Sequence, residues 1–182
     1  SDLLGLRVLK KVNDIIREEM DTVDGQEILM PALHSRQIWK ETGRDQTMDD
    51  VLYRIAGTDS QEFVLGPSHE EVVTPLVKKY VQSYKDLPLS VYQIQSKFRN
   101  EPRAKSGLLR GREFGMKDMY SFHLTEKDLD EYYEKSKGAY TRVYERCGLK
   151  SYIIEASGGA FTDKFSHEFS IETPAGEDTI IL

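Results

Sequence analysis

The spacing of apolar residues predicts two long amphipathic helices, one near each end of the chain. Apolar residues recur every three or four positions over residues 3–20, with charged residues between them. The same spacing runs from Thr125 to Cys147, where Thr125 is a typical N-cap and Gly148 a typical stop. Two shorter helices are expected at residues 35–42 and 69–83.

Between these helices, runs rich in apolar residues, several alternating with polar ones, predict short β-strands. The strands are expected at residues 27–31, 51–55, 62–65, 90–99, 112–122, 151–156, 167–173 and 178–182. The strands at 90–99 and 112–122 are expected to pair as a hairpin. Because no strand–helix–strand rhythm repeats, the order of elements favours an α+β fold with antiparallel strands flanked by helices.

The composition is typical of a soluble globular protein and argues against a membrane-spanning or disulfide-linked one. The chain has 182 residues, a net charge of −6 and 38% apolar residues, as in a soluble globular protein with a real core. No apolar run approaches the roughly 20 residues of a membrane span, so no membrane partner is expected. The single cysteine, Cys147, excludes an internal disulfide and fits a reducing, cytoplasmic location. The chain begins without Met and ends on a strand-like run, so we expect a fragment of a longer protein.

A basic loop interrupts this acidic chain. Five cations fall within fourteen residues, around a glycine-containing loop between the two hairpin strands: Arg99, Arg103, Lys105, Arg110 and Arg112. Clustered guanidinium and ammonium groups bind phosphate and carboxylate groups. The loop therefore predicts a site for an anionic ligand such as a nucleoside triphosphate.

Alternation along the two strands predicts one chemically mixed face. The first strand contributes Gln93, Gln95, Lys97 and Arg99, continued by Glu101, and the second contributes Arg112, Phe114, Met116, Asp118, Tyr120 and Phe122. If the two sets share a face, a guanidinium, a carboxylate and an aromatic ring meet there. Arg99 would bind a phosphate or carboxylate, Phe114 would stack on a base, and Glu101 would accept from an exocyclic amine.

Structural roles compete with these interpretations. A charged hairpin face is usually solvated, and Phe114 could belong to the core. Ser68, three residues before Glu71, matches a capping box, although a helix start can also bind an anion. The four histidines, His34, His69, His123 and His167, are expected to be hydrogen-bonded structural residues rather than bases or metal ligands. No serine or cysteine stands in a recognisable nucleophile context.

The hairpin resembles motif 2 of class II aminoacyl-tRNA synthetases. Phe98-Arg99-Asn100-Glu101, a loop, and Arg110 to Asp118 match its pattern F-R-x-E, R-x-x-x-F-x-x-x-D. The ordered strings LGLRVLKKVNDIIREEM, EILMPALHSRQIWKETGR, FVLGPSHEEVVT, YKDLPLSVYQIQSKFRNE, MKDMYSFH and SHEF with GED resemble bacterial-type prolyl-tRNA synthetase. The similarity covers nearly the whole chain and is weakest over residues 45–60.

This resemblance implies a partial class II catalytic domain over residues 1–182. Motif 1 would lie at about 3–33 and form a homodimer interface, and motif 2 at about 91–122. No segment matches motif 3 or an anticodon-binding domain. The resemblance therefore implies an incomplete active-site sheet, and a fragment that is weak or inactive alone.

The resemblance also implies the chemistry. Proline and ATP, with Mg²⁺, would form prolyl-adenylate, and the prolyl group would pass to tRNA(Pro). The implied catalytic residues are Arg99 and Arg110, and the implied ATP-binding residues are Arg99, Glu101, Arg110 and Phe114. The implied proline-binding residues are Ser68, Glu70, Arg99, Met116, Asp118 and Tyr120, with Ser68 replacing the usual threonine. Arg103 and Lys105 would contact the tRNA acceptor end, and no residue is assigned to a metal.

Three other functions remain open on the sequence. A non-catalytic paralogue could keep the fold, but the retained Arg99, Glu101, Arg110 and Phe114 argue against lost ATP chemistry. A class II synthetase for threonine, serine or glycine is a second possibility. The strings GPSHEE and SHEF argue against it. A dimerisation module would leave the basic loop unexplained.

Overall fold

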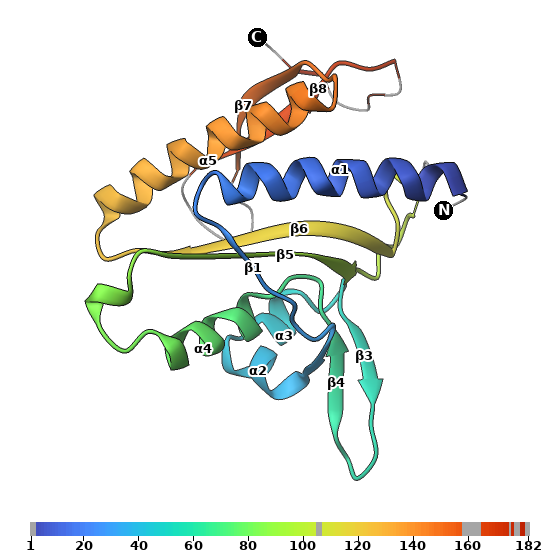
Figure 1. The fold of residues 1–182 in the computed structure, drawn as a ribbon. Coiled ribbons are helices and arrows are strands. Elements are labelled where there is room, and N and C mark those ends of the chain that lie inside the picture. The colour runs from blue at the N-terminus through green and yellow to red at the C-terminus, as the bar shows by residue number, and fades with distance from the viewer. Residues whose placement is uncertain (1–2, 105–106, 158–164, 175, 177–178, 181–182) are drawn as a thin grey trace. The chain divides into compact units, whose positions relative to one another are not determined.

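The computed structural model describes residues 3–104, 107–157, 165–174, 176, 179 and 180. Helices and strands alternate irregularly along the chain, and most strand pairs are antiparallel, which confirms the α+β class (Figure 1). The chain forms two compact units. We call residues 24–129 the central unit, and residues 1–23 with 130–182 the terminal unit.

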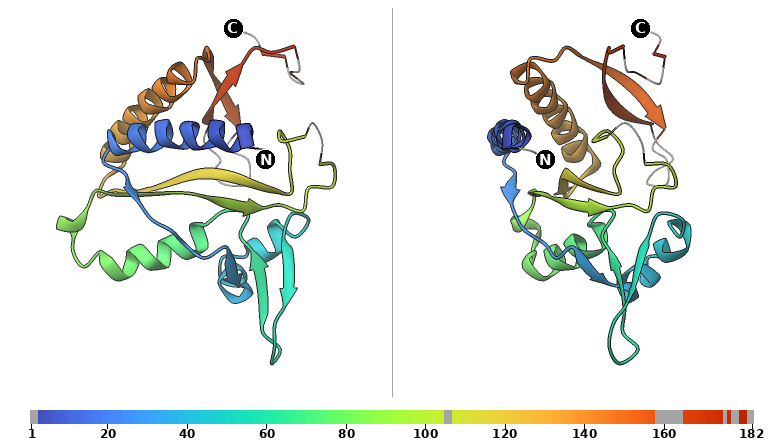
Figure 2. Two further views of the ribbon diagram at one scale, coloured as in Figure 1. Left: turned by 45° about the vertical axis from the view of Figure 1, so that its right-hand side comes forward. Right: turned by 90° about the vertical axis from the view of Figure 1, so that its right-hand side faces the viewer.

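The central unit holds the hairpin. Its elements are β1 (Gln26–Glu27), β2 (Leu33–Ser35), α2 (Arg36–Glu41), α3 (Arg44–Thr47), β3 (Tyr53–Ala56), β4 (Glu62–Leu65), α4 (Glu70–Tyr80), the 3₁₀ turn η1 (Tyr84–Asp86), β5 (Leu89–Phe98) and β6 (Glu113–Phe122). One sheet has the order β1-β5-β6, in which β1 runs parallel to β5 and β6 antiparallel to it. A second sheet has the order β2-β4-β3, and its β3–β4 hairpin extends away from the first sheet (Figure 2).

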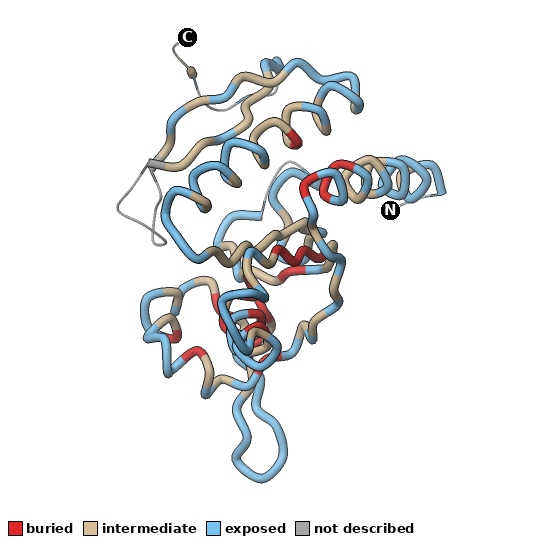
Figure 3. The backbone as a smooth tube through the Cα atoms, turned by 60° about the vertical axis from the view of Figure 1, so that its left-hand side comes forward, coloured by how far each residue is buried: buried red, intermediate tan, exposed pale blue. Residues whose placement is uncertain are grey.

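Two apolar clusters hold the central unit together. Val73 and Val77 of α4 pack against Val91 of β5, with the partly buried Tyr120 and Phe122 of β6 beside them. A second cluster joins Trp39, Leu52 and Val64, so it ties α2 to the second sheet. Figure 3 colours buried positions of the backbone red and partly buried positions tan. Because α4 lies on one face of β5 and β6, the segment leading into α4 is held against the same face.

The terminal unit contains α1 (Leu3–Asp21), most of α5 (Glu126–Arg146), β7 (Ser151–Ser157) and β8 (Phe165–Ile171). The buried Glu19 of α1 forms ion pairs with two arginines of α5. Its carboxylate oxygens lie 2.6 Å from Nε of Arg142 and 2.8 Å from Nη1 of Arg146. Thr125 caps α5 through a 3.2 Å bond from the Asp128 N–H, which confirms the predicted start of this helix. Among the described residues, no helix is long and apolar enough to cross a membrane.

Some predicted boundaries were wrong. The strand expected at 27–31 is only the pair at Gln26–Glu27, and β2 and α3 were not predicted. The helix expected at 69–83 spans Glu70–Tyr80. Of the strand expected at 178–182, Thr179 and Ile180 lie in no strand, and the other residues are outside the described part of the chain.

Candidate active site

The hairpin face predicted from alternation is confirmed by the register of β5 and β6. Gln93 lies opposite Asp118, Gln95 opposite Met116, and Lys97 opposite Phe114. Residues directly opposite each other in an antiparallel pair project from the same face of the sheet. The two polar sets therefore share one face, and it is the face against which α4 packs.

Arg99 and Phe114 meet on this face. The guanidinium carbon of Arg99 lies 5.5 Å from the centre of the Phe114 ring. Its Nε and Nη2 donate weakly to the Pro67 carbonyl at 3.4 and 3.3 Å. Among the described residues, no carboxylate forms an ion pair with this guanidinium. Both side chains are half-buried.

The remaining predicted nucleotide and tRNA residues lie along the hairpin loop. Arg103 and Arg110 are exposed, and Glu101 is half-buried. The strands continue to pair at the loop base, where the Arg99 N–H donates to the Arg112 carbonyl at 3.0 Å. Lys105 lies outside the described residues.

Ser68 does not cap α4, so the capping-box prediction was wrong. The helix begins at Glu70, its N-cap is His69, and no side chain caps it. The buried Ser68 hydroxyl instead accepts from Nη2 of Arg44 at 3.2 Å. Nη1 of the same arginine donates to both oxygens of the buried Glu71 at 2.8 and 3.0 Å. Both members of the apparent capping box are therefore bound by one guanidinium, which outcompetes the backbone N–H groups.

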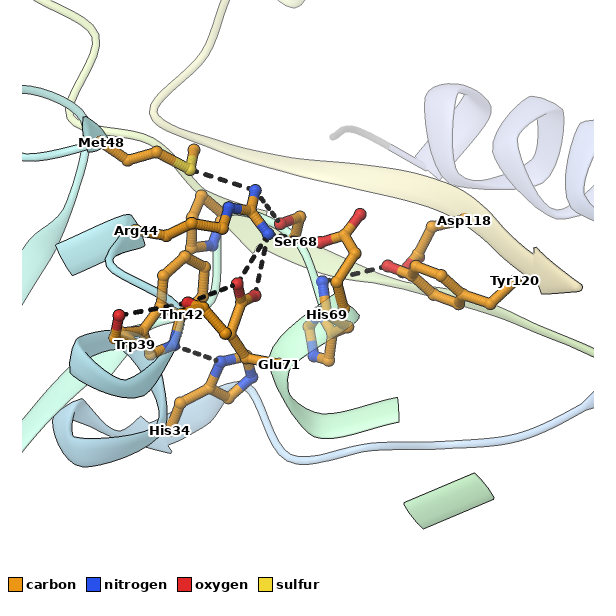
Figure 4. A network of polar contacts seen from close by, with 12 residues as sticks. His34, Trp39, Thr42, Arg44, Met48, Ser68, His69, Glu71, Asp118 and Tyr120 are labelled. Carbon is orange, nitrogen blue, oxygen red and sulfur yellow. Dashed lines mark hydrogen bonds and ion pairs between the residues drawn. The ribbon is translucent and has the colours of Figure 1, made fainter. Parts of the chain in front are cut away.

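Arg44 also binds Glu70, so it joins both residues predicted from the Ser68–Glu70 segment to hold proline. Figure 4 shows its contacts with Ser68 and Glu71. Its Nη1 lies 3.1 Å from Glu70 Oε2, and its guanidinium covers the Trp39 ring at 5.2 Å. Burial alone would lower the pKa of Arg44, but Glu70 and Glu71 together raise it. Sequence reasoning missed Arg44, because it lies where α3 was not predicted.

A second polar cluster lies beneath the Ser68–Glu70 segment, centred on Asp118. Its Oδ2 accepts from Gln93 at 3.0 Å, from Lys97 at 3.0 Å and from the Tyr120 hydroxyl at 2.6 Å. The Tyr120 oxygen in turn accepts the His69 N–H at 3.0 Å. Burial and the neighbouring carboxylate raise the pKa of Tyr120, which keeps its hydroxyl protonated as a donor.

His69 and His34 are buried, hydrogen-bonded side chains, as predicted. Nε2 of each ring donates to the same Pro31 carbonyl, at 3.0 Å from His69 and 2.8 Å from His34. Trp39 Nε1 donates to His34 Nδ1 at 3.3 Å. Burial first, and then the neighbouring His69, lower the pKa of His34 to about 4. The His34 ring is therefore neutral at pH 7, and burial also lowers the pKa of His69.

The other two histidines are also hydrogen-bonded, as predicted. His123 Nδ1 lies 2.9 Å from Asp128 Oδ2, and His167 Nδ1 lies 3.0 Å from the Tyr133 hydroxyl. Within the described ranges, no group of three or more His, Cys, Asp and Glu side chains could hold a metal ion. The guanidinium, carboxylate and aromatic groups on this face can bind a ligand and stabilise charge.

Comparison with known proteins gives concordant matches. The family model described as tRNA synthetase class II core domain (G, H, P, S and T) matches residues 53–177. Proline--tRNA ligase of Dehalococcoides mccartyi is 49% identical over 178 residues, which are 98% of this chain and 31% of that protein. The same ligase of Bacillus cytotoxicus is 50% identical over 177 residues, again 31% of its length. The chain thus spans about a third of these curated relatives.

Solved structures share the fold at much lower identity. Prolyl-tRNA synthetase of Giardia lamblia, in complex with prolyl-adenylate, superposes with a TM-score of 0.83 at 19% identity, covering 92% of this chain and 35% of that one. The enzyme of Cryptosporidium parvum, complexed with halofuginone and AMPPNP, gives 0.78 at 17% identity, covering 89% and 34%.

Proposed function

The chain belongs to the tRNA synthetase class II core domain family, and on this basis we propose that it carries the proline and ATP sites of a proline--tRNA ligase. The two curated relatives described above bear that name at about half identity along almost all of this chain. The observation that carries the proposal is the meeting of Arg99 and Phe114 on one sheet face. That pair suits a phosphate next to a stacked base.

The first step would join proline to AMP. A carboxylate oxygen of proline attacks the α-phosphorus of ATP, a new O–P bond forms, and the bond to the bridging oxygen breaks. Pyrophosphate leaves with that electron pair. Arg99 would stabilise the charge on the α-phosphate and the attacking carboxylate, Arg110 would hold the outer phosphates, and Glu101 would accept from the adenine amine. No side-chain nucleophile is needed.

The proline pocket would lie beside Arg99, at the Ser68–Glu70 segment. Glu70 would bind the cationic imino group, and the Ser68 hydroxyl would support it. Met116 would provide an apolar contact, while Asp118 and Tyr120 would fix the floor through their mutual hydrogen bond of 2.6 Å. Arg44 holds Ser68 and Glu70 together and so favours one geometry for both.

Several partners belong to the same proposal. Mg²⁺ would arrive on the ATP phosphates, which are its usual ligands in nucleotide-binding enzymes. Arg103 and Lys105 would contact the acceptor end of tRNA(Pro). Residues 3–33 would form a homodimer contact in the cytoplasm, since α1 exposes Leu3, Leu4 and Val8.

Amino-acid-dependent exchange between ATP and pyrophosphate tests this function. The natural gene product that carries this chain should catalyse exchange with proline, and not with threonine, serine or glycine. Exchange with one of those three would assign another specificity. ATP binding without any exchange would favour a non-catalytic paralogue.

A further inference from the structure

Lys97 is a fully buried lysine on the ligand-binding face of β5, two residues before Arg99. Its Nζ lies 2.9 and 3.0 Å from the two carboxylate oxygens of Asp118, and 2.6 Å from Nδ1 of His69. Nζ donates to Asp118 Oδ2 and to His69 Nδ1, while Asp118 Oδ1 belongs to the ion pair but makes no hydrogen bond. Lys97 is therefore positioned to hold other side chains rather than a ligand.

The hydrogen bonds fix which atoms of His69 carry a proton. Since the Pro31 carbonyl can only accept, Nε2 of His69 is the donor in their 3.0 Å contact. Nδ1 is then unprotonated and accepts from Lys97. With the bond from its backbone N–H to Tyr120, His69 is held at three points.

The three hydrogen bonds that hold His69 also restrict the positions of the residues before and after it. Ser68 and Glu70 are its sequence neighbours, and both contact Arg44, away from the atoms that hold His69. A shift of the His69 ring would therefore move the hydroxyl and the carboxylate of the proposed proline pocket. Buried ion pairs contribute little net stability compared with well-packed apolar groups, so Lys97 is better explained by geometry than by stability.

We propose that Lys97 is a positioning residue that sets amino-acid affinity by fixing the Ser68–Glu70 segment through His69. The proposal rests on the proposed function of this face. It makes Lys97 a determinant of proline binding without contact to proline or ATP. Asp118 takes part by holding the lysine, and Tyr120 by holding the His69 backbone.

A pH effect distinguishes this role from a merely structural one. Burial first, and then Lys97, lower the pKa of His69. The other groups that act on its ring are Asp118 of β6, His34 of β2 and Glu70 of α4, while Tyr120 of β6 contacts its backbone N–H. Asp118 and Glu70 act in the opposite direction to Lys97. Removing the ammonium therefore raises the pKa of His69 toward its ordinary value of about 6.5.

The experiment is steady-state exchange between ATP and pyrophosphate by the natural gene product with Lys97→Met. We expect KM for proline to rise at least about tenfold, because a misplacement near 1 Å can cost up to about a hundredfold, while KM for ATP changes less than about twofold. The acid limb of kcat/KM for proline should move to higher pH. Lys117→Met, which removes a lysine from the opposite face of β6, should change neither constant.

Three outcomes would overturn the proposal. If the folded Lys97→Met variant keeps the original KM for proline, Lys97 does not position the pocket. Equal changes in KM for proline and KM for ATP would lead to the same conclusion. Both results would leave the proposed function intact. Absence of proline-dependent exchange in the unsubstituted protein would overturn both proposals together. If Lys97→Met does not fold, His69→Gln breaks the same contact while keeping an amide donor for Pro31, and should raise KM for proline selectively.

Discussion

The neutral His34 ring predicts a specific loss of stability in acid. Its pKa falls from 6.5 to about 4 in the folded protein, chiefly because the ring is buried. Between these values the unfolded chain binds a proton that the folded chain does not, so stability decreases as the pH falls. The shift corresponds to about 3 kcal/mol, which is fully present above pH 6.5 and fully lost below pH 4.

Urea unfolding at several pH values measures this effect. Trp39 is the single tryptophan, it is buried, and its ring lies 6.0 Å from the His34 ring, so its fluorescence reports on this region. Carboxylates such as Asp45, whose pKa is lowered chiefly by its hydrogen bond from Arg36, also weaken the fold in acid. The informative quantity is therefore the difference between the unsubstituted protein and a variant without His34.

His34→Gln supplies that comparison, because its amide can still donate to Pro31 but has no ionisable ring. The stability advantage of the unsubstituted protein over this variant should shrink by about 3 kcal/mol between pH 7 and pH 4. The decrease should begin near pH 6.5. A difference that stays constant to within about 0.5 kcal/mol would refute the reasoning, since His34 would then titrate alike in both states.

Two further substitutions follow from the site. Glu70→Ala should raise KM for proline by about tenfold or more through loss of a charged hydrogen bond, with a much smaller effect on ATP in the exchange assay; equal effects on both would place Glu70 outside the amino-acid pocket. Gly66→Ala should lower the free energy of unfolding by about 1–3 kcal/mol through overpacking, since its Cβ would lie 2.5 Å from Cε1 of the fixed His34 ring. Gly115→Ala is the matched control, because nothing lies within 4 Å of its added Cβ, and equal unfolding energies for the two variants would contradict the assigned contact.

The hairpin face could be predicted because its signal is local. Side chains alternate along a strand, so the set of residues on each face of each strand followed from the sequence. The register that places the Arg99 set and the Phe114 set on one face was left as a condition, and the structure meets it. The resemblance to known synthetases extended this to residue roles. Those roles remain proposals, whereas the family and the fold agree with the comparisons.

The contacts of Lys97 and Arg44 could not be predicted, because they join segments that are distant in the sequence. Lys97 was assigned to the right face, but its partner His69 lies 28 positions away. Arg44 contacts Ser68 and Glu70 from 24 and 26 positions away, and it adjoins the stretch where the resemblance was weakest. Ser68 and Glu71 fitted a capping box by spacing alone, and only the position of the Arg44 guanidinium shows that the pattern is coincidental.

Single-turnover formation of prolyl-adenylate by an Arg99→Ala variant tests the central claim most directly. If this guanidinium stabilises the charge that develops as proline attacks ATP, the rate should fall by about a hundredfold to a thousandfold. Arg54→Ala, which removes a guanidinium from β3, should retain the original rate. A change of less than about threefold in Arg99→Ala would contradict the account, because an essential electrostatic contact cannot be lost at so small a cost.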